Sequence, residues 1–191
     1  MTLRSALSAV LAAALLIGLP AAATTMLRFD LTGLAQTADT VVHGTVRRAE
    51  SRWSGDRRRI VTDVEIEVTE TLKGQAGSTV VIVQPGGRVG DIGQMVHGLA
   101  TFTPGEEVVV FLERKGPSAF RVTGMAQGKY QVQRSADTRS ALAVPESTGD
   151  VLLLEPTTRK PTASTARTLP LDELKAAIRN ALQQPGKEKR Q

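Results

Sequence analysis

Hydrophobic and polar residues alternate most regularly in residues 59–72. Every second residue from Ile60 to Val68 falls on one side of an extended chain, and acidic side chains occupy much of the other side. Such alternation predicts a β-strand with one face in a core and one face in water. A long strand is also expected over 40–53, so the polar segment 54–58 predicts a hairpin turn between the two strands.

Shorter apolar segments, separated by turn residues, continue along the chain. We expect a short helix at 29–39 and further strands at 79–84, 106–114, 119–124 and 129–134, with a weaker hairpin joining 140–144 to 150–155. The strand at 106–114 has a continuous apolar run, so we expect it to be buried on both faces. Together these segments predict a mainly β domain over 24–155, a small antiparallel barrel or sandwich whose core lies at about 38–134.

The C-terminal part of the chain has a different composition. Residues 156–169 are rich in Pro, Thr, Ser and basic residues, which indicates a flexible linker. Leu174, Ile178 and other apolar residues then share one face over 170–184, which predicts an amphipathic helix followed by a charged tail, 185–191. We expect this helix to dock on the β domain, and a helix that binds a partner or a membrane surface is the alternative.

The N-terminal residues 1–23 have the pattern of a secretory signal peptide. Arg4 gives a positive start, an apolar run follows, and small residues precede the expected cleavage after Ala23. The apolar run is shorter than the roughly 20 residues that span a bilayer, which disfavours an uncleaved anchor. We therefore expect a secreted or periplasmic protein with no transmembrane segment after cleavage.

Composition narrows the chemistry of such an exported domain. The chain has no cysteine, which excludes disulfides, thiolate zinc sites and cysteine nucleophiles. Its formal net charge is +5, and removal of Arg4 with the leader gives +4 (5 − 1). This charge is short of the strong positive field of a dedicated nucleic-acid binder.

The glycine-rich segment 85–99 resembles a phosphate-binding loop only superficially. It contains neither the Lys nor the Ser or Thr of a P-loop, and a strand-like stretch rather than a helix follows it. We expect no nucleotide and no other cofactor here, and we interpret the glycines as positions of positive φ in a long bent connection between two strands. The side chains of this segment that could bind a ligand are Arg88, Asp91 and His97.

The two histidines suggest one enzymatic alternative. His43, Asp91 and His97 could form a metal site, because imidazole and carboxylate are ordinary metal ligands, and a metal-dependent hydrolase would follow. The histidines lack the close spacings typical of metal motifs, however, so surface or packed histidines are the better interpretation. We expect His43 to face outward from its strand, and we assign no catalytic residue and no metal ligand.

Arginines gather around the turn of the long hairpin. Five of them lie between residues 47 and 58, next to the only tryptophan: Arg47, Arg48, Arg52, Trp53, Arg57 and Arg58. The guanidinium groups of arginines and the indole ring of a tryptophan can together bind an anionic ligand. The acidic residues of the return strand, Asp63, Glu65 and Glu67, are expected opposite Arg47, Arg48 and Arg52, which predicts cross-strand charge pairing rather than an acid–base pair.

The order of these segments resembles the netrin-like module. The similarity rests on "ADTVVHGTV", "VTDVEIEVTETLKG", "STVVIVQPGG" and "FTPGEEVVVFLER", which together extend over roughly residues 38–124. The resemblance implies an OB-type (Greek-key) barrel, as in tissue inhibitors of metalloproteinases. Those inhibitors chelate zinc through an N-terminal cysteine, whereas cleavage here would leave Thr24 first, so no inhibitory residue carries over. The wider pattern, with "GMAQGKY", also resembles uncharacterised secreted bacterial proteins.

These observations favour an exported, non-enzymatic binding or protein-interaction module. The alternatives are the metal-dependent hydrolase and a binder of anionic polymers through the arginine hairpin. The expected partner is an extracytoplasmic protein or an anionic polymer, and the sequence does not predict an oligomeric state. The candidate binding residues are Arg47, Arg48, Arg52, Trp53, Arg57, Arg58, Arg88, Asp91 and His97.

Overall fold

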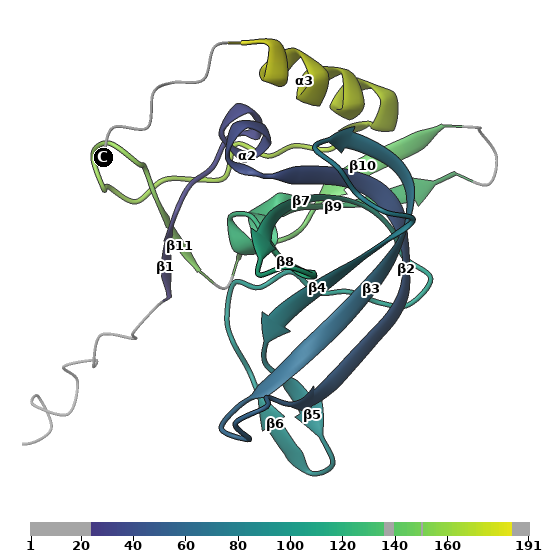
Figure 1. Ribbon diagram of the computed structural model, residues 1–191. Coiled ribbons are helices and arrows are strands. Elements are labelled where there is room, and N and C mark those ends of the chain that lie inside the picture. The colour runs from purple at the N-terminus through teal and green to yellow at the C-terminus, as the bar shows by residue number, and fades with distance from the viewer. Residues whose placement is uncertain (1–23, 136–139, 150, 185–191) are drawn as a thin grey trace, which may run out of the picture.

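A long antiparallel hairpin forms the centre of the protein. The computed structural model describes residues 24–135, 140–149 and 151–184, so the expected leader and charged tail lie outside the described residues (Figure 1). The hairpin consists of β2 (Thr40–Trp53) and β3 (Ile60–Lys73), which pair from Val41↔Lys73 to Trp53↔Ile60. The two strands and the turn that the alternation predicts are confirmed, with β3 displaced by one residue.

The remaining strands extend this hairpin into an eight-stranded, mostly antiparallel sheet. They are β4 (Thr79–Pro85), β7 (Glu107–Lys115), β8 (Ala119–Val122), β9 (Lys129–Arg134), β10 (Ala141–Pro145) and β12 (Leu169–Pro170). The sheet order is β12-β10-β9-β7-β2-β3-β4-β8, and β8 also pairs with β7. The only parallel contact in this sheet joins β4 to β8 through one residue pair, Ile82↔Phe120.

Two apolar clusters lie on opposite faces of the sheet. One contains Val42, Val46, Ile66, Ile82, Val110 and Leu112 among its buried residues. The other packs the sheet against α2 (Leu31–Thr37) and α3 (Leu171–Gln183), and it contains Val109, Phe111, Leu174 and Ile178. Alternate residues of β7 enter the two clusters, which explains why this strand is apolar at five consecutive buried positions and confirms burial on both faces.

The C-terminal helix α3 docks on the domain, as expected. Leu171, Leu174, Ile178 and Ala181 are buried against the sheet and α2. At its edge, Glu70 of β3 accepts hydrogen bonds from Lys175 and Arg179, each at 2.7 Å. Among the described residues, no helix has the length and hydrophobicity needed to cross a membrane.

The weaker hairpin expected between 140–144 and 150–155 is wrong. β10 pairs with β9 and β12, whereas β11 (Leu152–Leu154) pairs in parallel with β1 (Thr25–Leu27) near the N-terminus. A short apolar run indicates a strand but not its partner, and β1 is too short to show a clear period. The 3₁₀ turn η1 (Met125–Gly128) joins β8 to β9.

The glycine-rich segment is not a simple connection but contains a small hairpin. It is formed by β5 (Gly87–Val89) and β6 (Ile92–Gln94), which the sequence analysis missed. Gly86, Gly87, Gly90 and Gly98 have positive φ, so the conformational interpretation of these glycines is confirmed, although Gly93 has no such value. Figure 1 shows β5 and β6 beside the turn of the long hairpin, at the end of the sheet away from α3.

Candidate interaction surface at the tip of the long hairpin

The glycine-rich segment lies directly on the end of the long hairpin. Gly86 donates its N–H to the carbonyl of Ile60 (2.9 Å), and the Gly86 carbonyl accepts from Thr62 Oγ1 (2.7 Å). The Ile60 N–H donates in turn to Gln94 Oε1 (2.9 Å). We call residues 51–62 and 85–102 together the tip surface, because these bonds make one surface of two segments separated in sequence.

Gly87 is the residue that permits this close approach. Its φ is +126°, and a Cβ built there would collide with Ser51 Oγ and Thr62 Oγ1. The two hydroxyls are hydrogen-bonded to each other (2.9 Å) across β2 and β3. Only glycine allows the backbone to pass over them at this distance.

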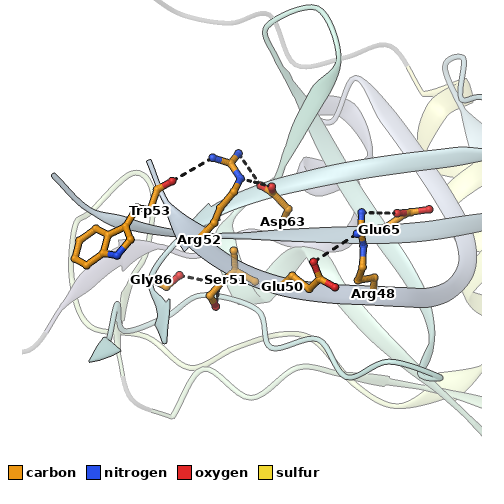
Figure 2. A network of polar contacts seen from close by, with 9 residues as sticks. Arg48, Glu50, Ser51, Arg52, Trp53, Asp63, Glu65 and Gly86 are labelled. Atoms are coloured by element: carbon orange, nitrogen blue, oxygen red, sulfur yellow. Dashed lines mark hydrogen bonds and ion pairs between the residues drawn. The ribbon is translucent and has the colours of Figure 1, made fainter. Parts of the chain in front are cut away.

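The outward side of the long hairpin carries the cross-strand ion pairs that the sequence predicts. Arg47 pairs with Glu67, Arg48 with Glu65 (3.2 Å), and Arg52 with Asp63 (2.5 Å). Figure 2 shows the Arg52 guanidinium between Asp63 and the carbonyl of Trp53. The hydrogen bond to Asp63 raises the pKa of Arg52.

Because of this pairing, three of the candidate residues are not free to bind an anionic ligand. Arg47, Arg48 and Arg52 already have carboxylate partners, so an anionic ligand would have to compete with them. Each of the three pairs is largely exposed and weak, and their role is to align the two strands.

Among the described residues, the turn itself leaves three arginines, Arg57, Arg58 and Arg59, without such partners. Asp56 accepts from the Ser54 hydroxyl (2.6 Å) and from the Arg58 N–H (3.2 Å), and the Ser54 bond is the main reason that the pKa of Asp56 is lowered. Arg57 has a left-handed backbone with φ of 54°. Within the part of the chain that the structure describes, the three guanidinium groups form no ion pair with a carboxylate.

Large apolar side chains are exposed next to these arginines. Trp53 is 37% exposed, and Figure 2 shows its indole pointing away from the polar network around Arg52 and Asp63. On the neighbouring segment, Ile92 is 56% and Met95 82% exposed. Exposed apolar groups of this size, gathered beside polar ones, are typical of a surface that contacts another molecule.

An open groove of about 560 Å³ lies between the glycine-rich segment and β3 and β4. Its apolar lining is contributed by Pro85, Met95, Val96, Leu99 and Phe102. Its polar lining includes Gln84, whose Nε2 donates to the Ala100 carbonyl (3.0 Å) and whose Oε1 is buried without a hydrogen-bond partner. The size and mainly apolar lining of this groove are within the range of ligand-binding sites.

A buried ion cluster holds one wall of the groove. Lys129 is 2% exposed, and its Nζ contacts Glu106 (2.6 Å), Glu146 (2.9 Å) and the Thr101 carbonyl. The same ammonium lies 5.0 Å from the centre of the Phe102 ring. This cluster could not be predicted from the sequence, because its one signal is a lysine at the start of an otherwise ordinary strand.

The three candidates on the glycine-rich segment lie at its exposed edge. Arg88 donates to the Gly90 carbonyl (3.0 Å), Asp91 occupies the turn between β5 and β6, and His97 is exposed close to the groove. They are therefore near the groove but do not line it.

The expectation that His43 faces outward into solvent is wrong. His43 is 4% exposed, and its Nε2 is 2.7 Å from Glu107 Oε1, while Arg134 donates two hydrogen bonds to the same carboxylate. Arg134, then His43, lowers the pKa of Glu107. The docking of α3 and β10 over this face of β2 buries the ring, which strand alternation alone cannot reveal.

The described residues hold no group of three His, Asp or Glu side chains arranged to bind a metal ion. His43 instead faces Glu107 under the C-terminal helix, and Asp91 lies on the turn of the β5–β6 hairpin. The geometry therefore does not support the metal-dependent hydrolase.

Comparison of the chain with protein-family models, curated proteins and solved structures found no match in any of the three.

Proposed function

We propose that the chain is an exported, non-enzymatic protein-interaction module built on an OB-type barrel, and that the tip surface contacts its partner. The observation that carries the proposal is the open apolar groove, which lies at the same end of the sheet as a turn with exposed arginines that have no carboxylate partner among the described residues (Figure 1). The leader-like residues 1–23 support export to the periplasm or the medium.

The strand pairing supports the OB-type interpretation. β2, β3, β4, β8 and β7 follow one another as neighbours, β7 pairs again with β2, and β4 and β8 are parallel. An OB fold is a five-stranded, partly open Greek-key barrel, and its ligands bind on the second and third strands and the loop between the first two. In this chain those parts would be β3 and β4, which contribute Thr62, Gln84 and Pro85 to the groove, and the arginine turn, which has a separate hollow lined by Trp53 and Arg57.

The polar groups of the tip surface favour binding over hydrolysis. Ser51 and Thr62 bond to each other, and Ser54 bonds to Asp56. A serine nucleophile instead needs a base and an orienting group in hydrogen-bond reach.

An anionic polymer is the second candidate ligand, because Arg57 and Arg58 are available to it. The apolar groove has no role in such a complex, however, so a protein partner accounts for more of the surface.

Site-specific photocrosslinking in the native host tests the proposed function. A photoreactive residue at Met95 is expected to give one discrete adduct, whereas the same residue at Leu142, which is 42% exposed on β10, gives none. The Met95 adduct is expected to fall several-fold in the variant Arg57→Ala/Arg58→Ala. Equal adducts from both positions, or none from Met95, would contradict a partner at the tip surface.

A further inference from the structure

The geometry points to the kind of partner: we infer that the groove binds an extended peptide segment in which an aliphatic or aromatic side chain is flanked by carboxylates. The inference rests on the proposed function, because it names the partner chemistry of the same surface. Three features of the groove carry it.

The first feature is the apolar lining. Met95 is 82% exposed, and Val96 and Leu99 line the open groove with it. Phe102 also lines the groove, while it packs against the apolar cluster inside the sheet. Burial of one apolar side chain against such a lining is favourable. A glycan or polyphosphate chain has no group of this kind.

The second feature is the orphaned acceptor of Gln84. Because Nε2 must face the Ala100 carbonyl, the orientation of the amide is fixed and Oε1 is the atom left unpaired. A buried acceptor without a donor destabilises the free protein. A peptide N–H next to the bound side chain would satisfy it, whereas a lipid acyl chain offers no donor.

The third feature is the charge of the tip surface around the groove. Arg57 and Arg58 on the turn and Arg88 on β5 are all exposed, and Asp91 is the exposed acid on the β5–β6 turn. Asp56 is already bonded to Ser54 and the Arg58 N–H. The side chains that remain available are mainly cationic, which favours carboxylates on either side of the apolar anchor and steers their approach.

Fluorescence anisotropy with the purified, exported protein tests this inference. The probes are three labelled octapeptides: one alternating Glu and Leu, one with Lys in place of Glu, and one with Ser in place of Leu. We expect the Glu/Leu peptide to bind at least about tenfold more tightly than either other peptide, since one buried side chain corresponds to a tenfold change or more.

Variants at each of the three features measure how much that feature contributes to the affinity for the Glu/Leu peptide. Met95→Ser and Arg57→Ala/Arg58→Ala are each expected to weaken the Glu/Leu peptide by about tenfold, and Gln84→Met by a similar factor. The matched controls, Leu142→Ser and Lys115→Ala/Lys160→Ala, change exposed residues outside the tip surface and should leave binding unchanged.

Each remaining outcome overturns the inference. Equal affinity for the Glu/Leu and Glu/Ser peptides, with full competition by heparin, would show a purely anionic ligand. No binding of any peptide, combined with a persistent crosslink from Met95, would refute the peptide partner while the proposed function stands. Loss of the crosslink as well would refute both.

Discussion

Lys129 carries a positive charge into the interior of the protein, where three acceptors surround it. Its Nζ has three N–H donors, and Glu106, Glu146 and the Thr101 carbonyl take one each. The cluster therefore joins the loop before β7 to the strand β9 and to Glu146 after β10. Because Thr101 and Phe102 also line the groove, this one residue connects core stability to the shape of the tip surface.

Replacement of this lysine is expected to be strongly destabilising. Lys129→Met leaves Glu106 and Glu146 buried without a counter-charge, so the free energy of unfolding should fall by about 3–5 kcal/mol. Urea denaturation at neutral pH measures the loss, and the double variant Lys129→Met/Glu106→Gln should recover part of it. Lys115→Met, at an exposed position, is the control, and a loss below about 1 kcal/mol for Lys129→Met would contradict the role assigned to the cluster.

At the residue scale, the sequence predicted the ion pairs across the long hairpin. It did not predict contacts that depend on how the rest of the chain folds. The partners of Arg48 and Arg52 could be predicted, because hairpin register places Glu65 and Asp63 opposite them. Lys129 could not, because Thr101 and Glu146 lie in loops that no predicted hairpin places opposite it. The same holds for His43, whose burial depends on the docking of a helix more than a hundred residues later.

The elements that form the tip surface differ in how far the sequence determines them. The long hairpin follows from alternation over two strands of 14 residues each. The β5–β6 hairpin has three residues per strand, too few for a period, and only its glycines mark it. Its position depends on Gly87, where the backbone crosses Ser51 and Thr62.

Gly87→Ala is expected to displace this hairpin and to leave the two apolar clusters intact. A Cβ there collides with the two hydroxyls, and φ of +126° is unfavourable for alanine, so the segment must move away from β2 and β3. Trp53 is the only tryptophan and lies on the tip surface, so its fluorescence emission should shift. Far-ultraviolet circular dichroism should remain unchanged.

Gly90→Asn provides the matched control for this variant. Gly90 also has positive φ, at 59°, but nothing lies within 4 Å of a Cβ built there, and asparagine tolerates this conformation. An equal emission shift in both variants would show that the conformation, rather than the close approach at Gly87, positions the hairpin.

On the scale of the whole molecule, the sheet separates two ends with different roles. One end is covered by α2 and α3 and is tied by Glu70 to the C-terminal helix (Figure 1). The other end carries the groove, the exposed apolar side chains and the free arginines. The carboxylates Glu70 and Glu107 of the covered end are engaged in ion pairs, which suits a scaffold, whereas the tip surface leaves cations and apolar groups available to a partner.

The ion pairs of the covered end make the stability of the whole molecule depend on acid pH. Hydrogen bonds from Lys175, with the charges of Lys175 and Arg179, lower the pKa of Glu70, and Arg134 and His43 lower the pKa of Glu107. A carboxylate whose pKa is lower in the folded state stabilises the protein above its unfolded pKa of about 4.3. This stabilisation is lost as the pH falls through the lowered, folded value.

The variant Glu70→Gln/Glu107→Gln should therefore be less stable than the unmodified protein at pH 7, by about 1–2 kcal/mol for these partly exposed pairs. Below about pH 4 the difference should narrow, because the unmodified protein then loses the same interactions. Urea denaturation at pH 7, 5 and 3.5 measures both effects, and Asp91→Asn, on the exposed β5–β6 turn, is the control. A difference that stays constant across this range would show that the two carboxylates contribute through packing rather than through their charge.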